Sequence, residues 1–421
     1  MDKTVLLIAY YFPPMGRVGA HRPVKMAKYL QRLGWKPVIL APDTPLFKDL
    51  ETSLLDEIKE LNIPVERVAL PGIPGVKRSF MQSDGLQRLI KWVTSWFYFP
   101  DNKKGWVEPA VEKALQVIRE HDVSIIFSTS PPQSNHLIAA SLKEKTGVPV
   151  VMDFRDDWLD SHLIRYPTRW HRRRMAHLEQ KTLGSADALT VINGAYQDSF
   201  RQRHADLNIP VEVVPNGYDA AQFAAAESTD GHDRFVIAYT GSFYEDMQPD
   251  TFFRAVRKVM DEDAEFAKAV DLQFAGGLTK RHWEHIRELK LQPILSDFGY
   301  VDFEQAVAMM MRADLLFLTL GNWAKGHAVT PSKLFEYMGT RNPILALVPD
   351  GITRSMLALY EASYMADVSD TDGAASHIHH AFRQWQLGEL PRGNEEFAAS
   401  FSREEAAKKL SDLMNRLLSN S

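Results

Sequence analysis

The sequence predicts an α/β protein built from two parallel-sheet domains. Three observations favour this class: apolar β-branched runs alternate with helix-length amphipathic stretches, turn residues break the chain near its middle, and 421 residues suffice for two or three domains. With 45% hydrophobic residues, such domains can bury substantial cores. Ligands of open parallel sheets bind beyond the carboxyl ends of the strands. Two such domains, facing each other, would place a site in the cleft between them.

The predicted strands are short apolar runs, and helices separate nearly all of them. In the first half of the chain they are Thr4 to Ala9, Pro37 to Ala41, Val65 to Leu70, Ser124 to Ser128, Val148 to Asp153, Ala188 to Ile192 and Val211 to Val214. In the second half they are Phe235 to Thr240, Val270 to Ala275, a short piece ending at Phe298, Leu315 to Leu318, Pro343 to Ala346 and Ser363 to Met365.

The domain boundary is predicted near Pro215-Asn216-Gly217-Tyr218, where turn residues precede an Ala-rich stretch and a polar one. This divides the chain into an N-terminal domain (1–215), a C-terminal domain (216–390) and a terminal segment (391–421). A capping box at Ser402-Arg403-Glu404-Glu405 opens a helix in that segment. We expect the helix to pack back onto the domains through one apolar stripe, which contains Leu410, Leu413, Met414, Leu417 and Leu418.

The composition excludes several classes of protein. Lys and Arg number 49 against 54 Asp and Glu, so the net charge of −5 offers no general attraction for nucleic acid. There is no cysteine, which excludes disulfides, thiolate metal sites and a thiol nucleophile, and fits a cytoplasmic protein. The apolar run near the start is too short to span a membrane. We therefore predict neither a signal peptide nor a transmembrane helix.

The most informative segment is Thr330-Pro331-Ser332-Lys333-Leu334-Phe335-Glu336. Thr330 is predicted as the N-cap of a helix with Pro331 at its first position. Lys333 then lies in the first turn, where a cation is unfavourable unless an anion binds there. Glu336 follows on the same face of the helix. The spacing suits a nucleoside diphosphate, with Lys333 on phosphate oxygens and Glu336 on ribose hydroxyls. The alternative is an exposed Lys-Glu pair.

Three further loops follow predicted strands. The loop 11–20 contains Gly16 and Arg17 and would let backbone N–H groups approach an anion, although it lacks the complete G-x-G-x-x-G spacing. It is equally consistent with a simple turn. The loop Asp153-Phe154-Arg155-Asp156-Asp157-Trp158 could bind sugar hydroxyls and stack on a sugar, or Arg155 could pair with neighbouring acids. In the loop 128–136, Ser134 could cap the next helix, leaving His136 as a surface residue or a catalyst.

The combination of ordered motifs resembles the bacterial retaining glycosyltransferases of family 4 (glycosyl transferases group 1). The motifs are YYFPP-x-G, PDNKKGW, STSPPQSNH, DFRDDW, VPNGYD and TPSKLFEYMGTRNPILA, and they span essentially the whole chain. The resemblance implies the two-domain GT-B fold. It also implies a nucleotide sugar, expected to be a UDP-sugar, bound mainly by the C-terminal domain, and a glycan or lipid-linked acceptor bound mainly by the N-terminal domain.

Site residues follow from the resemblance by position. It places Lys333 at the diphosphate, Glu336 at the ribose, and the base near Gly299-Tyr300-Val301. The full set expected to bind the donor is Gly16, Arg17, Gly241, Ser242, Tyr300, Val301, Pro331, Ser332, Lys333, Leu334 and Glu336. The residues expected to act in catalysis are His136, Asp153, Arg155 and Asp156.

The chain departs from the family pattern in three places. Ala328 stands where many members carry a Glu that contacts the donor sugar. The loop 241–248 lacks the Arg and Lys that usually hold the diphosphate, so that Lys333, Arg17 and helix N-termini would take over. Arg155 stands where some members place a His against the donor sugar. The identity of the donor sugar is open for these reasons.

The resemblance implies that the acceptor attacks from the leaving-group side while a diphosphate oxygen takes its proton. No base is then needed; should one act, Asp153, Asp156 and Asp157 are the candidates. No cofactor or metal is expected, since the acids at 261–263 and 370–372 fit helix ends or turns, and His377, His379 and His380 fit a solvated face. Within enzymes the alternative is a nucleotide-sugar epimerase of the same fold. The non-enzymatic alternative is a degenerate family member that only binds nucleotide or glycan.

Two features suggest peripheral binding to an anionic membrane surface at the inner face of the cell membrane. The stretch Leu86 to Phe99 is rich in interfacial aromatics. A strongly basic stretch contains Arg165, Arg169, Arg172, Arg173, Arg174 and Lys181. The alternative interpretation is a core helix plus a solvated face.

Overall fold

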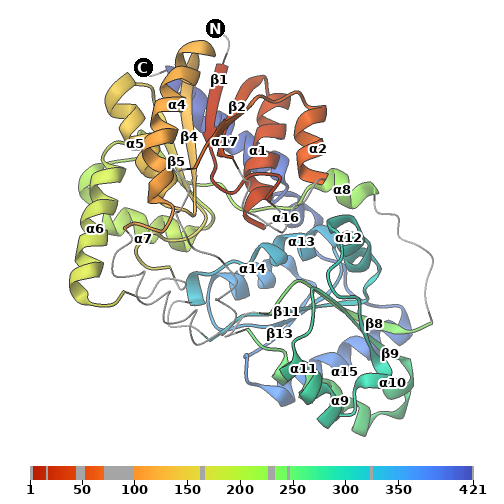
Figure 1. The fold of residues 1–421 in the computed structure, drawn as a ribbon. Coiled ribbons are helices and arrows are strands. Elements are labelled where there is room, and N and C mark those ends of the chain that lie inside the picture. The colour runs from red at the N-terminus through yellow and green to blue at the C-terminus, as the bar shows by residue number, and fades with distance from the viewer. Residues whose placement is uncertain are drawn as a thin grey trace. The chain divides into compact units, whose positions relative to one another are not determined.

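The computed structural model describes residues 3–15, 18–43, 53–70, 99–161, 166–225, 233–243, 247–322 and 326–419. The chain forms two compact units, one of Met1–Asn216 with Arg403–Ser421 and the other of Gly217–Ser402. Each unit contains one parallel β-sheet with helices against it (Figure 1). The predicted fold class, two parallel-sheet α/β domains, is confirmed. Residues 391–402 belong to the second unit, whereas the terminal helix belongs to the first.

The first unit has a seven-stranded sheet in the order β3-β2-β1-β4-β5-β6-β7. Its central strand β1 pairs in parallel with β2 and β4, so that Leu6 lies between Val38 and Ile126. The strands are β1 (Lys3–Ile8), β2 (Trp35–Pro42), β3 (Val65–Val68), β4 (Val123–Ser130), β5 (Val150–Phe154), β6 (Ala188–Val191) and β7 (Val211–Val213).

The helices of the first unit alternate with its strands. They are α1 (His21–Arg32), α2 (Ser53–Glu60), α4 (Val107–Glu120), α5 (Ser134–Thr146), α6 (Arg169–Leu183), α7 (Gly194–Arg203) and α17 (Arg403–Ser419), with short 3-10 turns η1 (Val18–Ala20), η3 (Lys104–Trp106) and η4 (Ala205–Leu207). Helices α1, α2 and α17 cover one face of the sheet, where Leu410 and Met414 of α17 join a core with Val5 and Leu7 of β1. Trp35 Nε1 also donates to Ser411 Oγ of α17 at 2.9 Å.

The second unit has a six-stranded sheet in the order β10-β9-β8-β11-β12-β13. Its strands are β8 (Phe235–Thr240), β9 (Val270–Ala275), β10 (Leu295–Asp297), β11 (Leu315–Thr319), β12 (Ile344–Leu347) and β13 (Ser363–Ala366). Its helices are α8 (Ala220–Ala225), α9 (Asp250–Glu262), α10 (Ala264–Ala269), α11 (Lys280–Glu288), α12 (Phe303–Arg312), α13 (Ser332–Thr340), α14 (Ile352–Tyr360), α15 (Thr371–Leu387) and α16 (Glu395–Ala399), with 3-10 turns η5 (Gln292–Ile294) and η6 (Gly326–Ala328).

Strand β8 shows why these runs are apolar at every position. Phe235 and Ile237 face a core formed with α9, α10 and α15, whereas Val236 and Ala238 face a second core formed with α12, α13 and α14. Successive side chains of a strand point to opposite faces, so a strand covered on both faces needs apolar residues throughout. Each predicted strand overlaps an observed one.

Among the described residues, no helix is long and apolar enough to cross a membrane.

Candidate functional site

In the second unit, glycine-containing loops follow the neighbouring strands β8, β9 and β10. Gly241 and Gly276 adopt φ values of 112° and 128°, which favour glycine. Gly241 N donates to Ala275 O, and Gly276 N donates to Gly299 O, both at 2.6 Å. A Cβ on Gly276 would lie 2.4 Å from the carbonyl of Gly241. The absence of a side chain therefore lets the three loops pack backbone against backbone at the carboxyl edge of the sheet.

Helix α13 starts beside these loops. It begins at Ser332 with Pro331 as N-cap, so the prediction of Thr330 as N-cap is wrong; Pro331 has the extended backbone of a cap residue. Within the part of the chain that the structure describes, no side chain caps this N-terminus. Tyr337 Oη, further along α13, accepts a hydrogen bond from Thr240 N at 3.2 Å, which fixes the helix to the end of β8. The helix therefore presents uncapped N–H groups and a partial positive charge at the carboxyl edge.

Lys333 directs its ammonium toward the loop after β8. Its Nζ donates to Tyr239 Oη at 3.2 Å and lies 4.3 Å from the centre of the Tyr239 ring. The Phe243 ring stacks on the Tyr239 ring, with the two ring centres 4.1 Å apart. A Cβ on Gly241 would lie 2.2 Å from Lys333 Nζ, so this glycine makes room for the ammonium.

Lys333 is half-buried and keeps some exposed surface. Burial lowers the pKa of Lys333 to about 8, and the nearby Glu336 carboxylate acts in the opposite direction. A cation held under these conditions gains from a bound anion, because the anion restores the stabilisation that burial removes. Tyr300, which is 85% exposed, follows β10, and a Cβ on Gly277 would lie 3.4 Å from its ring.

The sequence-predicted donor residues of the second unit therefore meet at one edge of its sheet. Gly241 and Ser242 lie in the loop after β8, and Ser242 Oγ donates to Gly276 O at 3.2 Å. Residues 331–336 form the start of α13, and Tyr300 and Val301 lie in the loop after β10. An ammonium, uncapped helix N–H groups and close glycine backbone are the groups that bind phosphate oxygens in proteins.

In the first unit, the carboxyl edge of the sheet holds a buried ion pair. Asp153, at the end of β5, is fully buried and accepts from Arg22 Nη2 at 2.7 Å, and from the hydroxyls of Thr129 and Thr190, both at 2.7 Å. Burial acts to raise the pKa of Asp153, but Arg22 and the two hydroxyls outweigh it and lower the pKa below its ordinary value. Arg22 also donates to Val214 O and Pro215 O, both at 2.8 Å.

Arg155 makes three hydrogen bonds to backbone carbonyls. Its guanidinium donates to Ser130 O, Gly19 O and Pro131 O, each at 2.8 Å. It therefore fixes the loops after β1 and β4 rather than pairing with neighbouring acids. Asp156, the next residue, lies in the turn after β5 and keeps part of its surface exposed.

His136 is fully buried, so the expectation of a surface residue is wrong. Its Nδ1 lies 2.8 Å from Ser128 Oγ, and its ring centre lies 4.3 Å from that of Phe154. Burial lowers the pKa of His136 to about 3, so the imidazole is neutral at neutral pH. The structure thus brings His136, Asp153 and Arg155 to one edge of the sheet, where each contacts neighbouring segments of the same chain. Ser134 begins α5, but Asp101 caps the helix by accepting from Ser134 N at 2.9 Å.

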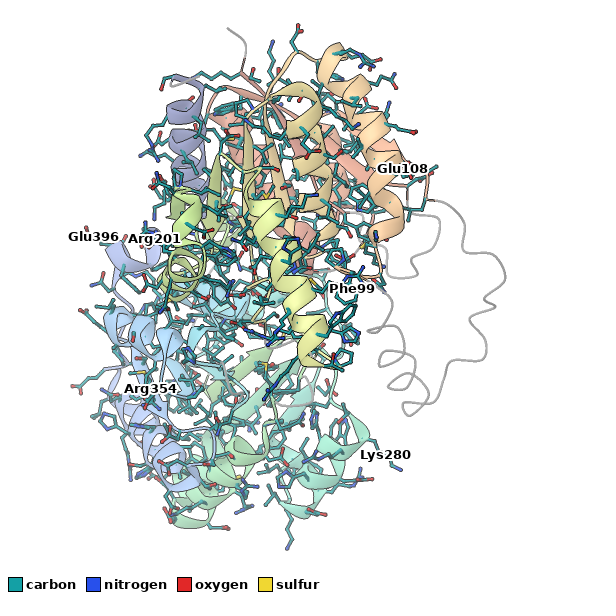
Figure 2. All side chains as sticks on the ribbon, turned by 90° about the vertical axis from the view of Figure 1, so that its left-hand side faces the viewer. Phe99, Glu108, Arg201, Lys280, Arg354 and Glu396 are labelled. Atoms are coloured by element: carbon teal, nitrogen blue, oxygen red, sulfur yellow. The ribbon has the colours of Figure 1, made fainter. Side chains whose placement is uncertain are left out.

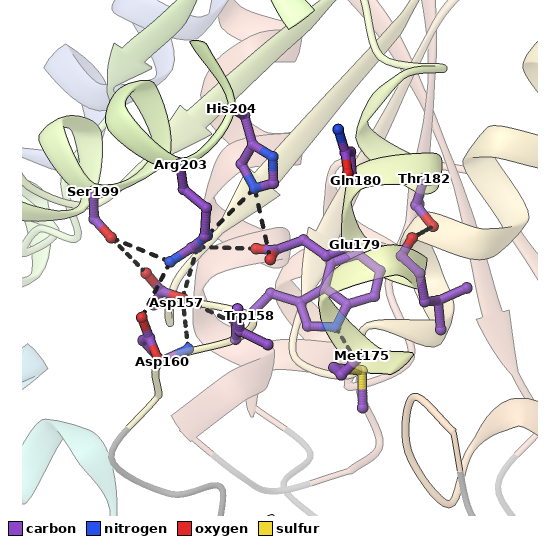
Figure 3. A network of polar contacts seen from close by, with 12 residues as sticks. Asp157, Trp158, Asp160, Met175, Glu179, Gln180, Thr182, Ser199, Arg203 and His204 are labelled. Atoms are coloured by element: carbon purple, nitrogen blue, oxygen red, sulfur yellow. Dashed lines mark hydrogen bonds and ion pairs between the residues drawn. The ribbon is translucent and has the colours of Figure 1, made fainter. Parts of the chain in front are cut away.

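Asp157 and Trp158 anchor the loop after β5 (Figure 3). Asp157 accepts from Arg203 Nη2 at 2.9 Å and from Ser199 Oγ at 3.1 Å, and the same Nη2 donates to Glu179 at 2.9 Å. Trp158 is fully buried with its Nε1 3.2 Å from Met175 Sδ. It cannot stack on a sugar, so that expectation is wrong.

The acids and histidines that were not expected to bind a metal have structural partners in the protein. Asp263 and Asp370 cap α10 and α15, as predicted for helix-end acids. His379 Nε2 lies 3.0 Å from Asp263, and His377 Nε2 lies 3.1 Å from Met365 O, so these two are not simply solvated. In the described ranges, no group of three or more His, Asp or Glu is arranged to hold a metal ion.

Several predicted residues lie outside the described part of the chain. They are Gly16 and Arg17 of the first loop, residues 86–98 of the aromatic stretch, and Arg165 of the basic stretch.

Two residues that organise these edges were not predicted from the sequence. Arg22 and Tyr239 lie 131 and 94 positions from Asp153 and Lys333, so neither contact is visible as a spacing. For Arg22 there was one signal, a cation in the first turn of a helix, where it is unfavourable without a nearby anion.

Residues 20–217 match the family described as glycosyl transferase 4-like domain. This confirms the resemblance drawn from the motifs, and the two parallel-sheet units fit the GT-B architecture. A comparison with curated proteins finds no significant match.

Several solved structures share the fold of this chain over nearly its full length. A glycosyltransferase from Rickettsia africae is 15% identical with a TM-score of 0.66, and sucrose-phosphate synthase from Thermosynechococcus elongatus is 14% identical with a TM-score of 0.69; both comparisons cover 100% of each chain. Anabaena HepE in complex with UDP and glucose is 15% identical with a TM-score of 0.60, covering 98% of this chain and 99% of the other.

Proposed function

We propose that the chain transfers a sugar from a UDP-sugar to a glycan or lipid-linked acceptor, with retention of anomeric configuration and without a metal. One observation carries this proposal: the ammonium of Lys333 lies at the uncapped start of α13, beside glycine loops at the carboxyl edge of the second sheet. The similarity to a structure that holds UDP and glucose supports the choice of donor.

The donor residues have distinct roles in this proposal. The Lys333 ammonium and the backbone N–H groups of Ser332 and Lys333 bind the diphosphate, together with the backbone of Gly241 and Ser242. Glu336, one turn along α13, accepts from ribose hydroxyls. The base lies against Tyr300 and Val301, since the exposed Tyr300 ring offers a flat apolar surface. The role of Gly16 and Arg17 at the phosphates stays a prediction, because both residues lie outside the described part of the chain.

Transfer requires that the bond between the sugar carbon and the diphosphate oxygen breaks as the acceptor oxygen bonds to the same face of that carbon. The acceptor proton passes to the departing diphosphate oxygen, which balances the step without a protein base. Lys333 and the helix N-terminus stabilise the negative charge that grows on the diphosphate. Of Asp153, Asp156 and Asp157, only Asp156 keeps exposed surface to contact the acceptor, while Asp153 and Arg155 position the loops.

We further propose a cytoplasmic enzyme at the inner face of the cell membrane, because a lipid-linked acceptor would lie there and the synthesis of a cell-surface polysaccharide or glycoconjugate would begin there. The net charge of −5 argues against a nucleic acid partner.

A panel of nucleotide sugars tested by thermal shift examines the donor site directly. A ligand that binds only the folded protein raises its stability with the logarithm of its concentration over the dissociation constant. We expect UDP and one UDP-sugar to raise the melting temperature, and Lys333→Ala and Glu336→Ala to lose most of this effect. Unchanged affinity in both variants would reject the site.

A product assay separates transfer from its alternatives. Acceptor-dependent release of UDP supports transfer, and the anomeric configuration of the product tests retention. Release of UDP or conversion of donor without an acceptor indicates an epimerase, whereas UDP binding without turnover indicates a degenerate member. Activity that is lost in EDTA and restored by Mg²⁺ would contradict metal independence.

A further inference from the structure

Helix α6 of the first unit carries a continuous basic face. At 100° of rotation per residue, all exposed side chains of α6 except Arg172 fall within one sector of the helix. His171, Met175, Glu179, Thr182 and Leu183 are buried on the other side. The exposed sector contains Arg169, Trp170, Arg173, Arg174, His177, Gln180 and Lys181. These residues define the basic face. It contains no carboxylate.

The charges of the basic face are not neutralised within the described residues. Neither Arg169, Arg173 nor Lys181 forms an ion pair there. Arg172, which lies outside the face, does pair, at 3.0 Å from Asp160. The one acid on the helix, Glu179, is buried and accepts from Arg203 at 2.9 Å. The concentration of cations is notable because the chain as a whole has a net charge of −5.

Aromatic rings accompany the cations at the start of α6. Trp170 is 58% exposed. The Arg174 guanidinium carbon lies 4.7 Å from the centre of the Phe99 ring and 5.4 Å from that of Trp170. Figure 2 shows Phe99 beside this helix, which is drawn in yellow. A large exposed indole is costly in water but favourable at the interface between water and lipid, where Trp is enriched.

We propose that the basic face of α6 binds the anionic surface of a lipid bilayer. Long Arg and Lys side chains reach phosphate headgroups, and the Trp170 indole enters the headgroup region. Each Lys or Arg near an anionic surface contributes to binding, and the contribution is screened by salt. The exposed Trp and the restriction of the cations to one helix favour lipid over nucleic acid. This proposal deepens the proposed function by giving its membrane partner a docking surface.

The test measures co-sedimentation of the full chain with vesicles of phosphatidylcholine alone or with phosphatidylglycerol added. We expect binding only to the vesicles that contain phosphatidylglycerol, and weaker binding at higher salt. The variant Arg169→Gln/Arg173→Gln/Lys181→Gln should lower the partition coefficient by roughly 100-fold, from three surface charges. Trp170→Ser should lower it by several-fold.

A matched control removes three exposed cations from other helices of the same unit: Arg119→Gln/Lys145→Gln/Lys409→Gln. It should retain most of the binding. The proposal is overturned if both triple variants lose binding equally, if neutral vesicles bind as well, or if wild type binds neither vesicle. Binding of an oligonucleotide through the same three residues, without vesicle binding, would also overturn it.

UDP binding without vesicles separates this proposal from the proposed function. The α6 triple variant should bind UDP as wild type does, which also shows that it is folded. If wild type binds anionic vesicles through α6 but does not bind UDP, the transferase proposal fails and the docking surface stands. If UDP binds but vesicles do not, the docking surface fails alone.

Discussion

The carboxyl edges of the two sheets hold similar residue types but use them differently. In the first unit, Asp153 and Arg22 are buried and bonded to each other, and Arg155 is bonded to three carbonyls. In the second unit, Lys333 keeps exposed surface and lies at a helix start that no described side chain caps. At the edge of the first sheet, other protein groups satisfy the charges. At the edge of the second sheet, the charge of Lys333 remains available for a ligand.

This difference separates structural from binding charges more reliably than residue type does. A buried charge with a complete set of partners holds its loops in place, and removing one partner leaves the other charge uncompensated. A cation whose pKa is lowered by burial, next to uncapped N–H groups, is stabilised when an anion arrives. The first kind of charge should control folding, and the second should control ligand affinity.

The largest expected effect comes from breaking the buried pair. Asp153→Ala leaves the Arg22 guanidinium buried without its carboxylate, so we expect a loss of about 3–5 kcal/mol in the free energy of unfolding. Urea denaturation measures this. Asp156→Ala, which removes a neighbouring and more exposed acid, should cost less than about 1 kcal/mol. If Asp153→Ala were as stable as Asp156→Ala, the ion pair would not hold this edge together.

The pH dependence of stability follows from the same pair. Because folding lowers the pKa of Asp153, its stabilisation is fully present above the pKa of the unfolded chain and is lost as the pH falls through the folded value. In the Asp153→Asn variant, the free energy of unfolding should therefore fall less steeply as the pH decreases.

The second effect concerns the second edge. Lys333→Ala should weaken UDP binding by about 10- to 100-fold, the range for a lost hydrogen bond to a charged group. The free energy of unfolding should change by less than about 1 kcal/mol, since no described carboxylate pairs with Lys333 at ion-pair distance. Isothermal titration calorimetry measures the affinity. Lys280→Ala, which removes a cation that is 90% exposed in the same unit, is the control and should bind UDP normally.

The central strands could be predicted from the sequence because they are buried on both faces and are therefore largely apolar, as in β8. The start of α13 was predicted to within one residue from Thr330 and Pro331. The burial of His136 and Trp158 could not be predicted, because a residue that follows a strand can point inward or outward. The contact of Lys333 with Tyr239 depends on how β8 and α13 pack, and a local sequence pattern does not predict that packing.

The third effect is the pH dependence of UDP binding. With a pKa of about 8 in the free protein, Lys333 is protonated at pH 7 and largely neutral at pH 9. Above pH 8 the affinity should fall by up to about tenfold per pH unit, until the higher pKa of the bound state is reached. Titrations from pH 7 to 9 in buffers of different ionisation enthalpy should also show proton uptake on binding. The Lys333→Ala variant should show neither the fall in UDP affinity above pH 8 nor the proton uptake that Lys333 contributes.

The smallest effect tests how Lys333 is positioned. Tyr239→Phe keeps the ring that stacks on Phe243 but removes the hydroxyl that accepts from the ammonium. A single hydrogen bond of this kind supports a two- to tenfold change in UDP affinity, as an order-of-magnitude expectation.

The lost acceptor should also lower the pKa of Lys333 further, so the fall in UDP affinity should begin at lower pH. That shift is the readout that a purely structural role for Tyr239 would not produce. Tyr364→Phe is the matched control, because it removes a tyrosine hydroxyl that bonds to Gln384 elsewhere in the same unit. A pH profile of Tyr239→Phe that superimposes on the wild-type profile would mean that the hydroxyl does not tune the ammonium, and that the helix start and Gly241 position Lys333 without it.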